Sequence, residues 1–139
     1  MIILDTNVVS ELMRESPDPH VIAWINCQKR IDLSFTSISL GEIQRGLARL
    51  PRGKRRLRLE DSFSAFINEG FRGRLFPYDE AAAYAYGEIA AGLEQAGINT
   101  DAIDLMIASI ARVRKASIAT RNVNDFKHCG IKVINPWVD

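Results

Sequence analysis

The sequence predicts an α/β protein in which a parallel sheet is covered by helices. Short apolar runs alternate along the chain with segments of helical period, and capping or turn residues separate the two. No repeat, low-complexity tract or Pro/Gly-rich linker interrupts this alternation, and 139 residues is a common domain size. We therefore expect residues 1–139 to form one domain.

The first half of the chain begins with an apolar run, 1–4, that ends at Asp5, Thr6 and Asn7, all good helix N-caps. This pattern predicts a buried strand followed by a helix. A helix is expected over 18–28, a strand over 33–36, and a helix over 39–50. The apolar stripe of that last helix consists of Leu40, Ile43, Leu47 and Leu50.

The second half opens with a break at 51–53, which ends the preceding helix. A longer amphipathic helix follows, with an apolar face of Leu59, Phe63, Phe66 and Ile67. Strands are expected over 74–78, 117–120 and 131–134, and helices over 79–96 and 100–115. Gly97 is suited to end the first of these two helices.

Composition indicates an ordinary soluble protein, with 47% hydrophobic and 25% charged residues. No apolar stretch approaches the roughly 20 residues of a membrane-spanning helix, and the N-terminus lacks the features of a secretory signal. Cys27 and Cys129 have no partners at zinc-site spacing, so two thiols in a reducing compartment are expected; a disulfide between them is the alternative. We expect a cytoplasmic protein.

The net charge of +1 conceals a basic segment. Seven basic residues and no acid lie between positions 45 and 58, so the remaining residues together carry −6. The basic residues are Arg45, Arg49, Arg52, Lys54, Arg55, Arg56 and Arg58. Such a segment suggests an anionic partner; the alternative is a solvated helix face.

Three acids occupy positions where an α/β sheet binds ligands, which is at the carboxyl ends of its strands. Asp5 ends the first strand, Glu42 follows the second, and Asp104 lies early in the helix before the strand 117–120, which Arg121 and Asn122 follow. Each acid alone could be a cap or an exposed helix residue. Asp104, however, borders a very apolar helix, where a carboxylate needs a partner.

Carboxylates that gather at one point repel each other and raise one another's pKa. A hard divalent cation such as Mg²⁺ or Mn²⁺ relieves that repulsion, because it takes oxygen ligands and retains waters that it can activate. The only histidines, His20 and His128, are not at the strand ends of this cluster. The pattern therefore favours a Mg²⁺ or Mn²⁺ site over a zinc or histidine-based one.

Four segments carry a resemblance to a known family: Leu-Asp-Thr-Asn at 4–7, Ser-Leu-Gly-Glu-Ile at 39–43, Asp-Leu-Met-Ile-Ala at 104–108, and Ala-Thr-Arg-Asn-Val-Asn-Asp-Phe at 119–126. With these segments in this order, the sequence resembles the PIN-domain nucleases from end to end. Within them it is most similar to VapC-type toxins of bacterial toxin–antitoxin pairs, in their FitB-like branch.

The resemblance implies a three-layer α/β/α fold and a Mg²⁺- or Mn²⁺-dependent endoribonuclease that uses a metal-activated water. It implies metal ligation by Asp5, Glu42 and Asp104. The fourth catalytic position falls on Asn122, which lacks the charge some relatives have there, and Asp125 is the candidate for that charge. Thr6 and Thr120 would orient neighbouring groups through their hydroxyls.

The resemblance also implies a homodimer and a small VapB-like antitoxin, with DNA bound only through that antitoxin. Residues 43–67 are the candidate docking surface; alternatively Leu59, Phe63 and Phe66 pack only within the protein. The residues expected to bind RNA or the partner are Arg45, Arg49, Arg52, Lys54, Arg55 and Arg121. Trp24 and Trp137 are expected to pack in the core and the tail.

Two other functions share features with this sequence. A haloacid-dehalogenase-like phosphatase also begins with an Asp after its first strand, but it needs a second Asp where this chain has Asn7. A PIN-fold subunit that binds an antitoxin–DNA complex with little nuclease activity is the alternative that Asn122 leaves open. The sequence does not identify the RNA, since phosphate contacts carry no sequence information.

Overall fold

The computed structural model describes all 139 residues and contains one five-stranded sheet in which every pairing is parallel. The strand order is β3-β2-β1-β4-β5. The strands are β1 (Ile2–Leu4), β2 (Leu33–Thr36), β3 (Leu75–Phe76), β4 (Ser117–Ala119) and β5 (Val133–Ile134). The predicted parallel sheet is therefore confirmed, and its edge strands are shorter than expected.

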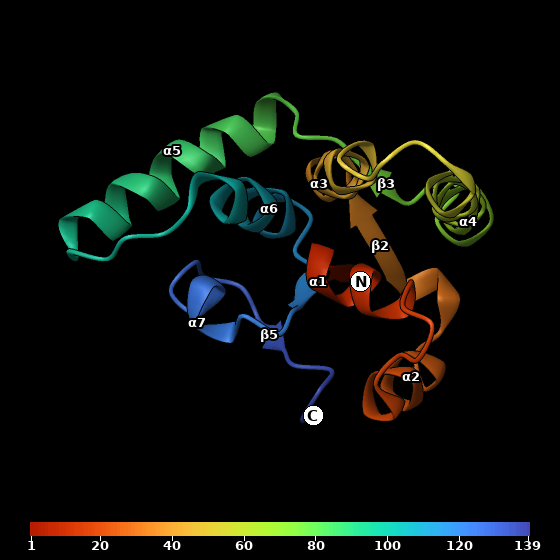
Figure 1. The fold of residues 1–139 in the computed structure, drawn as a ribbon. Helices are drawn as coiled ribbons and strands as arrows, with labels where there is room; N and C mark the ends of the chain where they lie inside the picture. The colour runs from red at the N-terminus through yellow and green to blue at the C-terminus, as the bar shows by residue number, and fades with distance from the viewer.

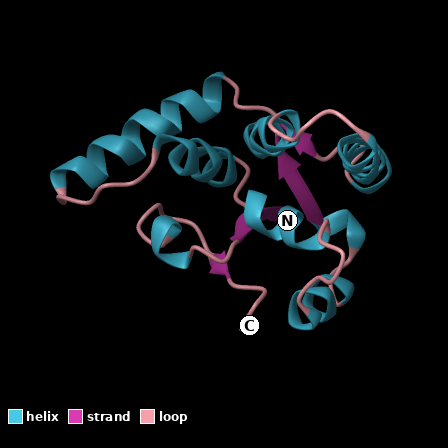
Figure 2. Ribbon diagram, in the orientation of Figure 1, coloured by secondary structure: helices cyan, strands magenta, loops and turns pink.

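Helices cover both faces of the sheet and make three layers (Figures 1 and 2). One face carries α5 (Glu80–Gln95), α6 (Ala102–Val113) and α7 (Val123–Phe126); the other carries α1 (Thr6–Leu12), α2 (Pro19–Asn26) and α4 (Lys54–Gly70), while α3 (Ser37–Ala48) follows the carboxyl end of β2. Strand β1 contributes to both cores, because Ile3 belongs to the apolar cluster under α5 and α6 and Leu4 to the opposite one. The three-layer α/β/α prediction is confirmed.

Side-chain caps explain where most helices begin. Asp5, Thr36, Asp79 and Asp101 each accept a hydrogen bond from a backbone N–H in the first turn of α1, α3, α5 and α6. Thr36 is the reason α3 begins at Ser37, two residues earlier than expected. Two short elements escaped prediction, α7 and a 3₁₀ turn at Arg30–Asp32, because a single turn has no readable period.

The strand order places the ends of β1 and β4 side by side. From β1 the chain builds outward through β2 to β3, and it then returns to add β4 and β5 on the other side. The crevice at such a reversal is where open α/β sheets bind ligands. Asp5 follows β1 there, and its backbone N–H donates to the carbonyl of Ala119 at the end of β4.

No helix in the structure has both the length and the apolar character needed to cross a membrane. Both cysteines are free thiols, Cys27 exposed and Cys129 buried.

Candidate active site

An open cavity of about 470 Å³ lies at the crevice between β1 and β4. It brings together six residues that the sequence analysis singled out: Asp5, Thr6, Glu42, Asp104, Arg121 and Asn122. The elements that supply them are the start of α1, the middle of α3, the first turn of α6 and the turn after β4. The predicted convergence of these segments on one edge of the sheet is therefore what the fold produces.

Asp5 is buried and held by hydrogen bonds on both carboxylate oxygens. Its Oδ1 accepts from the backbone N–H of Thr6 at 2.8 Å, and its Oδ2 accepts from the Thr120 hydroxyl at 2.7 Å. Asn7 Nδ2 is also 3.3 Å from Oδ2. Burial nevertheless raises the pKa of Asp5, against the opposite effect of these hydrogen bonds from Thr120 and Thr6, and Glu42 and Asp125 add repulsion.

Thr120 organises this side of the cavity although it is fully buried. Its hydroxyl donates to Asp5 and accepts from Asn7 Nδ2 at 3.3 Å and from the backbone N–H of Asn122 at 3.0 Å. One side chain thus links the end of β4 to the first residues of α1.

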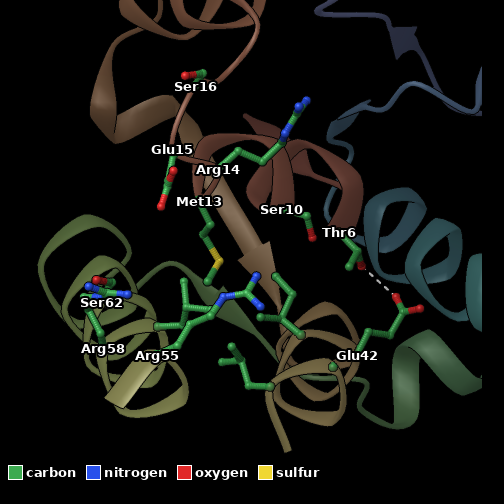
Figure 3. Close-up of a pocket in the computed structure, with 14 residues that line it drawn as sticks. Thr6, Ser10, Met13, Arg14, Glu15, Ser16, Glu42, Arg55, Arg58 and Ser62 are labelled. Carbon is green, nitrogen blue, oxygen red and sulfur yellow. Dashed lines mark hydrogen bonds between the residues drawn. The ribbon is translucent and has the colours of Figure 1, made fainter. Parts of the chain in front are cut away.

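Glu42 is exposed and approaches the cavity from α3. Its Oε1 accepts a hydrogen bond of 2.6 Å from the hydroxyl of Thr6, which Figure 3 shows as a dashed line. The two threonines therefore serve different acids, since Thr6 orients Glu42 and Thr120 orients Asp5.

Asp104 is half-buried and has no hydrogen bond or ion pair within the chain. Its pKa is raised to about 7, mainly by burial and then by the nearby carboxylates of Asp5, Asp125, Asp101 and Glu42, in decreasing order of effect. The partner that a carboxylate in this position needs is absent from the protein itself.

The donor set of the cavity suits a hard cation. Its acids offer only oxygen, and no histidine or cysteine lines it. As arranged, no three His, Cys, Asp or Glu side chains are grouped so that they could hold an ion on their own. Mg²⁺ does not require such a cage, because it usually keeps several waters and binds one or two carboxylates together with substrate phosphate. The residues present fit that mode of binding.

Two residues are candidates for the fourth catalytic position: Asn122 and, further from the cavity, Asp125. Asn122 is exposed and lines the cavity, whereas Asp125 lies on α7 outside the lining. Asp125 still raises the pKa of both Asp5 and Asp104, so its charge reaches the cavity. The choice between these two residues stays a prediction.

The predicted basic residues are divided by the structure. Arg121 lines the acidic cavity, and Arg55 lines a second, larger groove of about 890 Å³ between α1, α3 and α4. The other four are exposed and line neither: Arg45, Arg49, Arg52 and Lys54. Arg56 instead forms an ion pair of 2.6 Å with Glu60.

The second groove meets the acidic cavity, since Thr6, Ser10, Arg14 and Glu42 line both. In Figure 3, Met13, directly after α1, and Arg55, from α4, point into it. Its apolar wall is formed by Met13, Ile43, Leu47 and Leu59. Of the three side chains whose role was open, Leu59 faces this groove, whereas Phe63 is buried and Phe66 packs on Phe71 at 5.1 Å between ring centroids.

Among the residues that line the cavity, Glu11, Asn7 and Trp137 were not predicted to do so. Glu11 is buried, pairs with Arg14 at 2.9 Å and accepts from the backbone N–H of Asp18 at 3.0 Å. The sequence feature that could have placed Glu11 at the cavity is its spacing, because it lies four residues after Asn7 on the same face of α1. Asn7 was noted only as a cap, and Trp137 was expected to pack in the tail, yet both line the cavity.

Comparisons with known proteins identify similar sequences and structures. Residues 2–132 match the PIN domain family. The chain is 36% identical to VapC ribonuclease Y4jK of Sinorhizobium fredii, covering 99% of this chain and 98% of that protein. It is 34% identical to toxin FitB of Neisseria gonorrhoeae over the full length of both. A solved structure of FitAB bound to an IR36 DNA fragment superimposes with a TM-score of 0.93 at 34% identity, covering 99% of this chain and 96% of that one.

Proposed function

Since the chain belongs to the PIN domain family, we propose that it is a Mg²⁺- or Mn²⁺-dependent endoribonuclease and the toxin of a toxin–antitoxin pair. The observation that carries the proposal is Asp104. Its half-buried carboxylate has no partner in the protein, has a pKa of about 7, and shares a cavity with Asp5 and Glu42. Relatives named ribonuclease and toxin support the same activity.

In this proposal Asp5, Asp104 and Glu42 hold the cation, with Asp5 and Glu42 already oriented by Thr120 and Thr6. The bound cation would supply a water activated for attack on phosphorus and neutralise charge on the phosphate oxygens. Asp104 is poised to lose its proton near neutral pH, because its pKa is about 7. Asn122 and Asp125 provide the fourth catalytic position, where an amide or a carboxylate would orient water.

RNA phosphates are the natural ligand of the two cations at the cavity, Arg14 and Arg121. Arg14 is exposed beyond its ion pair with Glu11, and Arg121 is exposed at the turn after β4. Both lie beside the acids, so a phosphate bound by either would be near the proposed cation. The PIN-fold subunit without nuclease activity is not favoured, because such a subunit would have no need for an unpaired acidic cluster.

The experiment that tests the activity compares RNA cleavage by the purified chain, with Mg²⁺, Mn²⁺ or EDTA, against the variants Asp5→Asn and Asp101→Asn. Asp5→Asn keeps the shape of a side chain that lines the cavity, while Asp101→Asn changes an exposed acid that caps α6 and does not line the cavity. We expect cleavage that needs the cation, is lost in Asp5→Asn and persists in Asp101→Asn. Cleavage that is indifferent to EDTA, or equal in both variants, contradicts the proposal.

We assign the partner to the second groove. Its apolar wall and the cations Arg14, Arg55 and Arg58 suit an amphipathic, partly acidic helix of a small VapB-like antitoxin, and its end opens into the acidic cavity. A segment bound there would block substrate at Glu42. By analogy with FitAB on DNA, the antitoxin would carry the DNA contact. Arg58→Glu should weaken the complex with the product of the adjacent gene, whereas Arg52→Glu, outside the groove, should not.

We further propose that residues 1–139 form one domain that acts in the cytoplasm as a homodimer. Support for a single domain comes from the sheet, whose two faces carry the two main apolar clusters of the chain. Sedimentation of the isolated chain tests the dimer; a monomer at micromolar concentration would contradict it.

A further inference from the structure

The acidic cavity contains an aromatic residue, Trp137, that has no role in the chemistry described above. Trp137 lies three residues after β5, near the end of the chain, and is partly exposed. It is the only apolar residue that lines the cavity; the other lining residues are acids, arginines, amides and hydroxyls. The aromatic ring therefore offers a flat apolar surface in a cavity whose other lining residues are all polar.

The tail holds this ring in place by local hydrogen bonds. Asn135 Oδ1 accepts from the backbone N–H of Trp137 at 2.9 Å, and the Asn135 carbonyl accepts from Val138 and Asp139 at 3.1 and 2.8 Å. Asp139 Oδ2 accepts in return from the backbone N–H of Asn135 at 2.7 Å. The turn is tied to the sheet one residue earlier, because the Ile134 carbonyl accepts from Thr120 N–H at 2.9 Å.

Arg121 links the ring to the proposed chemistry. Its guanidinium carbon lies 5.2 Å from the centre of the Trp137 ring, within the range of a cation–π contact. Its backbone N–H donates to Asn7 Oδ1 at 3.2 Å, and Asn7 in turn contacts Asp5. The backbone of Arg121 is thus tied to the residues that hold Asp5, and its guanidinium lies against the indole in the same cavity as the acids.

Packing alone does not account for this arrangement. Part of Trp137 contacts the apolar cluster under α1 and α4, which explains why the tail is anchored. A residue that served only as an anchor would be covered, as the preceding Pro136 is. Trp137 instead leaves part of its surface in the cavity, beside a planar cation that nucleic acids recognise by stacking and by phosphate contact.

We infer that Trp137 and Arg121 form a nucleotide-binding platform for single-stranded RNA. The indole stacks on a base adjacent to the scissile phosphate, and the Arg121 guanidinium binds a phosphate of the same nucleotide. Stacking of this kind tolerates any base, because every base has a π face. It also requires an unpaired strand, so the platform restricts the substrate to single-stranded segments. The inference rests on the proposed ribonuclease function.

Binding is tested by fluorescence in a Trp24→Phe, Asp104→Asn background. The chain has only two tryptophans, so Trp137 becomes the only indole, and Asp104→Asn is expected to prevent cleavage. The probes are a six-nucleotide single-stranded RNA of mixed sequence and the same backbone with abasic sites. We expect the intact RNA to quench Trp137 and to bind about 5- to 150-fold more tightly than the abasic one, as loss of one stacked base implies. Equal quenching by both, or none by either, overturns the inference.

Cleavage by the wild-type chain and its tail variants gives a second readout. Trp137→Leu keeps an apolar anchor but has no π face, so its KM for single-stranded RNA should rise about 5- to 150-fold with kcat nearly unchanged. Trp137→Phe should recover most of that loss. A Trp137→Leu chain that melts like the wild type and keeps its KM refutes the platform. If Trp137→Leu does not fold, the Phe variant and the fluorescence titration decide.

The two proposals fail differently. RNA that quenches Trp137 but is never cleaved by the wild-type chain contradicts the nuclease and leaves the platform. RNA that is cleaved with no change in Trp137→Leu contradicts the platform and leaves the nuclease.

Discussion

Replacing Asp104 by Asn should make the protein more stable when no divalent cation is present. The wild-type carboxyl has a pKa of about 7, raised from an ordinary value of 3.8 by burial and by the neighbouring acids. The folded protein therefore holds this proton more tightly than the unfolded chain does. The contribution of this carboxyl to stability is therefore fully present below about pH 4, is lost as the pH rises toward 7, and is then constant.

The size of the effect follows from the difference between the two pKa values. A pKa change from 3.8 to about 7 corresponds to roughly 4 kcal/mol of destabilisation above pH 7. Because the carboxyl is only half-buried, solvent screening reduces this to about 1–2 kcal/mol. Asn cannot ionise, so Asp104→Asn should remove the loss and be that much more stable than wild type at pH 8 in EDTA.

A matched control is available one helical turn earlier. Asp101 and Asp104 both carry charge at the N-terminus of α6, so either change to Asn loses a similar interaction with the helix dipole. Asn also caps a helix well, so Asp101→Asn keeps the hydrogen bond to Ile103 N–H, which Asp101 accepts at 3.1 Å. Any gain that is specific to Asp104→Asn therefore comes from the acidic cavity.

The assay is urea unfolding of the three proteins at pH 4.5 and pH 8, with EDTA, Mg²⁺ or Mn²⁺. At pH 8 we expect the cations to stabilise the wild type and Asp101→Asn but to have little effect on Asp104→Asn. At pH 4.5 in EDTA, wild type and Asp104→Asn should differ little. If Asp104→Asn gains no stability at pH 8, or gains as much from the cations as the wild type, the reasoning about this site is wrong.

Three further predictions concern the same structure. Thr120→Val should cost about 1–3 kcal/mol in urea unfolding, because it leaves the buried Asp5 Oδ2 without its best donor; Thr120→Ser should recover most of the loss. Phe63→Ala should cost about 3–5 kcal/mol, whereas Leu57→Ala, at a position that is 61% exposed, should change stability by about 0.5 kcal/mol or less. RNA binding should weaken with salt, and Arg121→Ala should reduce the slope of log K against log salt by about 0.7 if one phosphate contact is lost; an unchanged slope would remove Arg121 from the phosphate contacts.

The acids could be located from sequence because each lies next to a local pattern that marks the end of a strand or the start of a helix. Asp5 caps the helix after a buried strand, and Asp104 borders an apolar helix whose next residues are Leu105, Ile107 and Ala108, all buried. Those signals are local, and a parallel sheet brings strand ends to one edge by construction. Asn7 and Glu11 were missed for a related reason, since both have ordinary helical roles that hide their contacts with Asp5 and Arg14.

Strand order is a different kind of information. Alternating strands and helices predict a parallel sheet without saying which strands are neighbours, because the order depends on where each crossover packs. Here β1 lies between β2 and β4, and that placement alone brings Thr120 to Asp5, 115 residues away along the chain. In the basic segment, by contrast, the fold separates residues that are neighbours in the sequence. Its residues are adjacent in sequence, yet the turn between α3 and α4 sends Arg55 to a groove and leaves Arg52 outside it.

Trp137 depends on both kinds of information, which is why its position in the cavity could not be predicted. The local pattern Asn135-Pro136-Trp137 describes only a turn, and a tryptophan near a chain end is most simply a tail anchor. The ring reaches the cavity because β5 pairs with β4, so the tail turn begins next to the residue that precedes Arg121. If RNA binds at these acids as proposed, an aromatic residue placed there by strand pairing would lie beside it. The substrate preference of this protein should therefore depend on the tail as much as on the carboxylates.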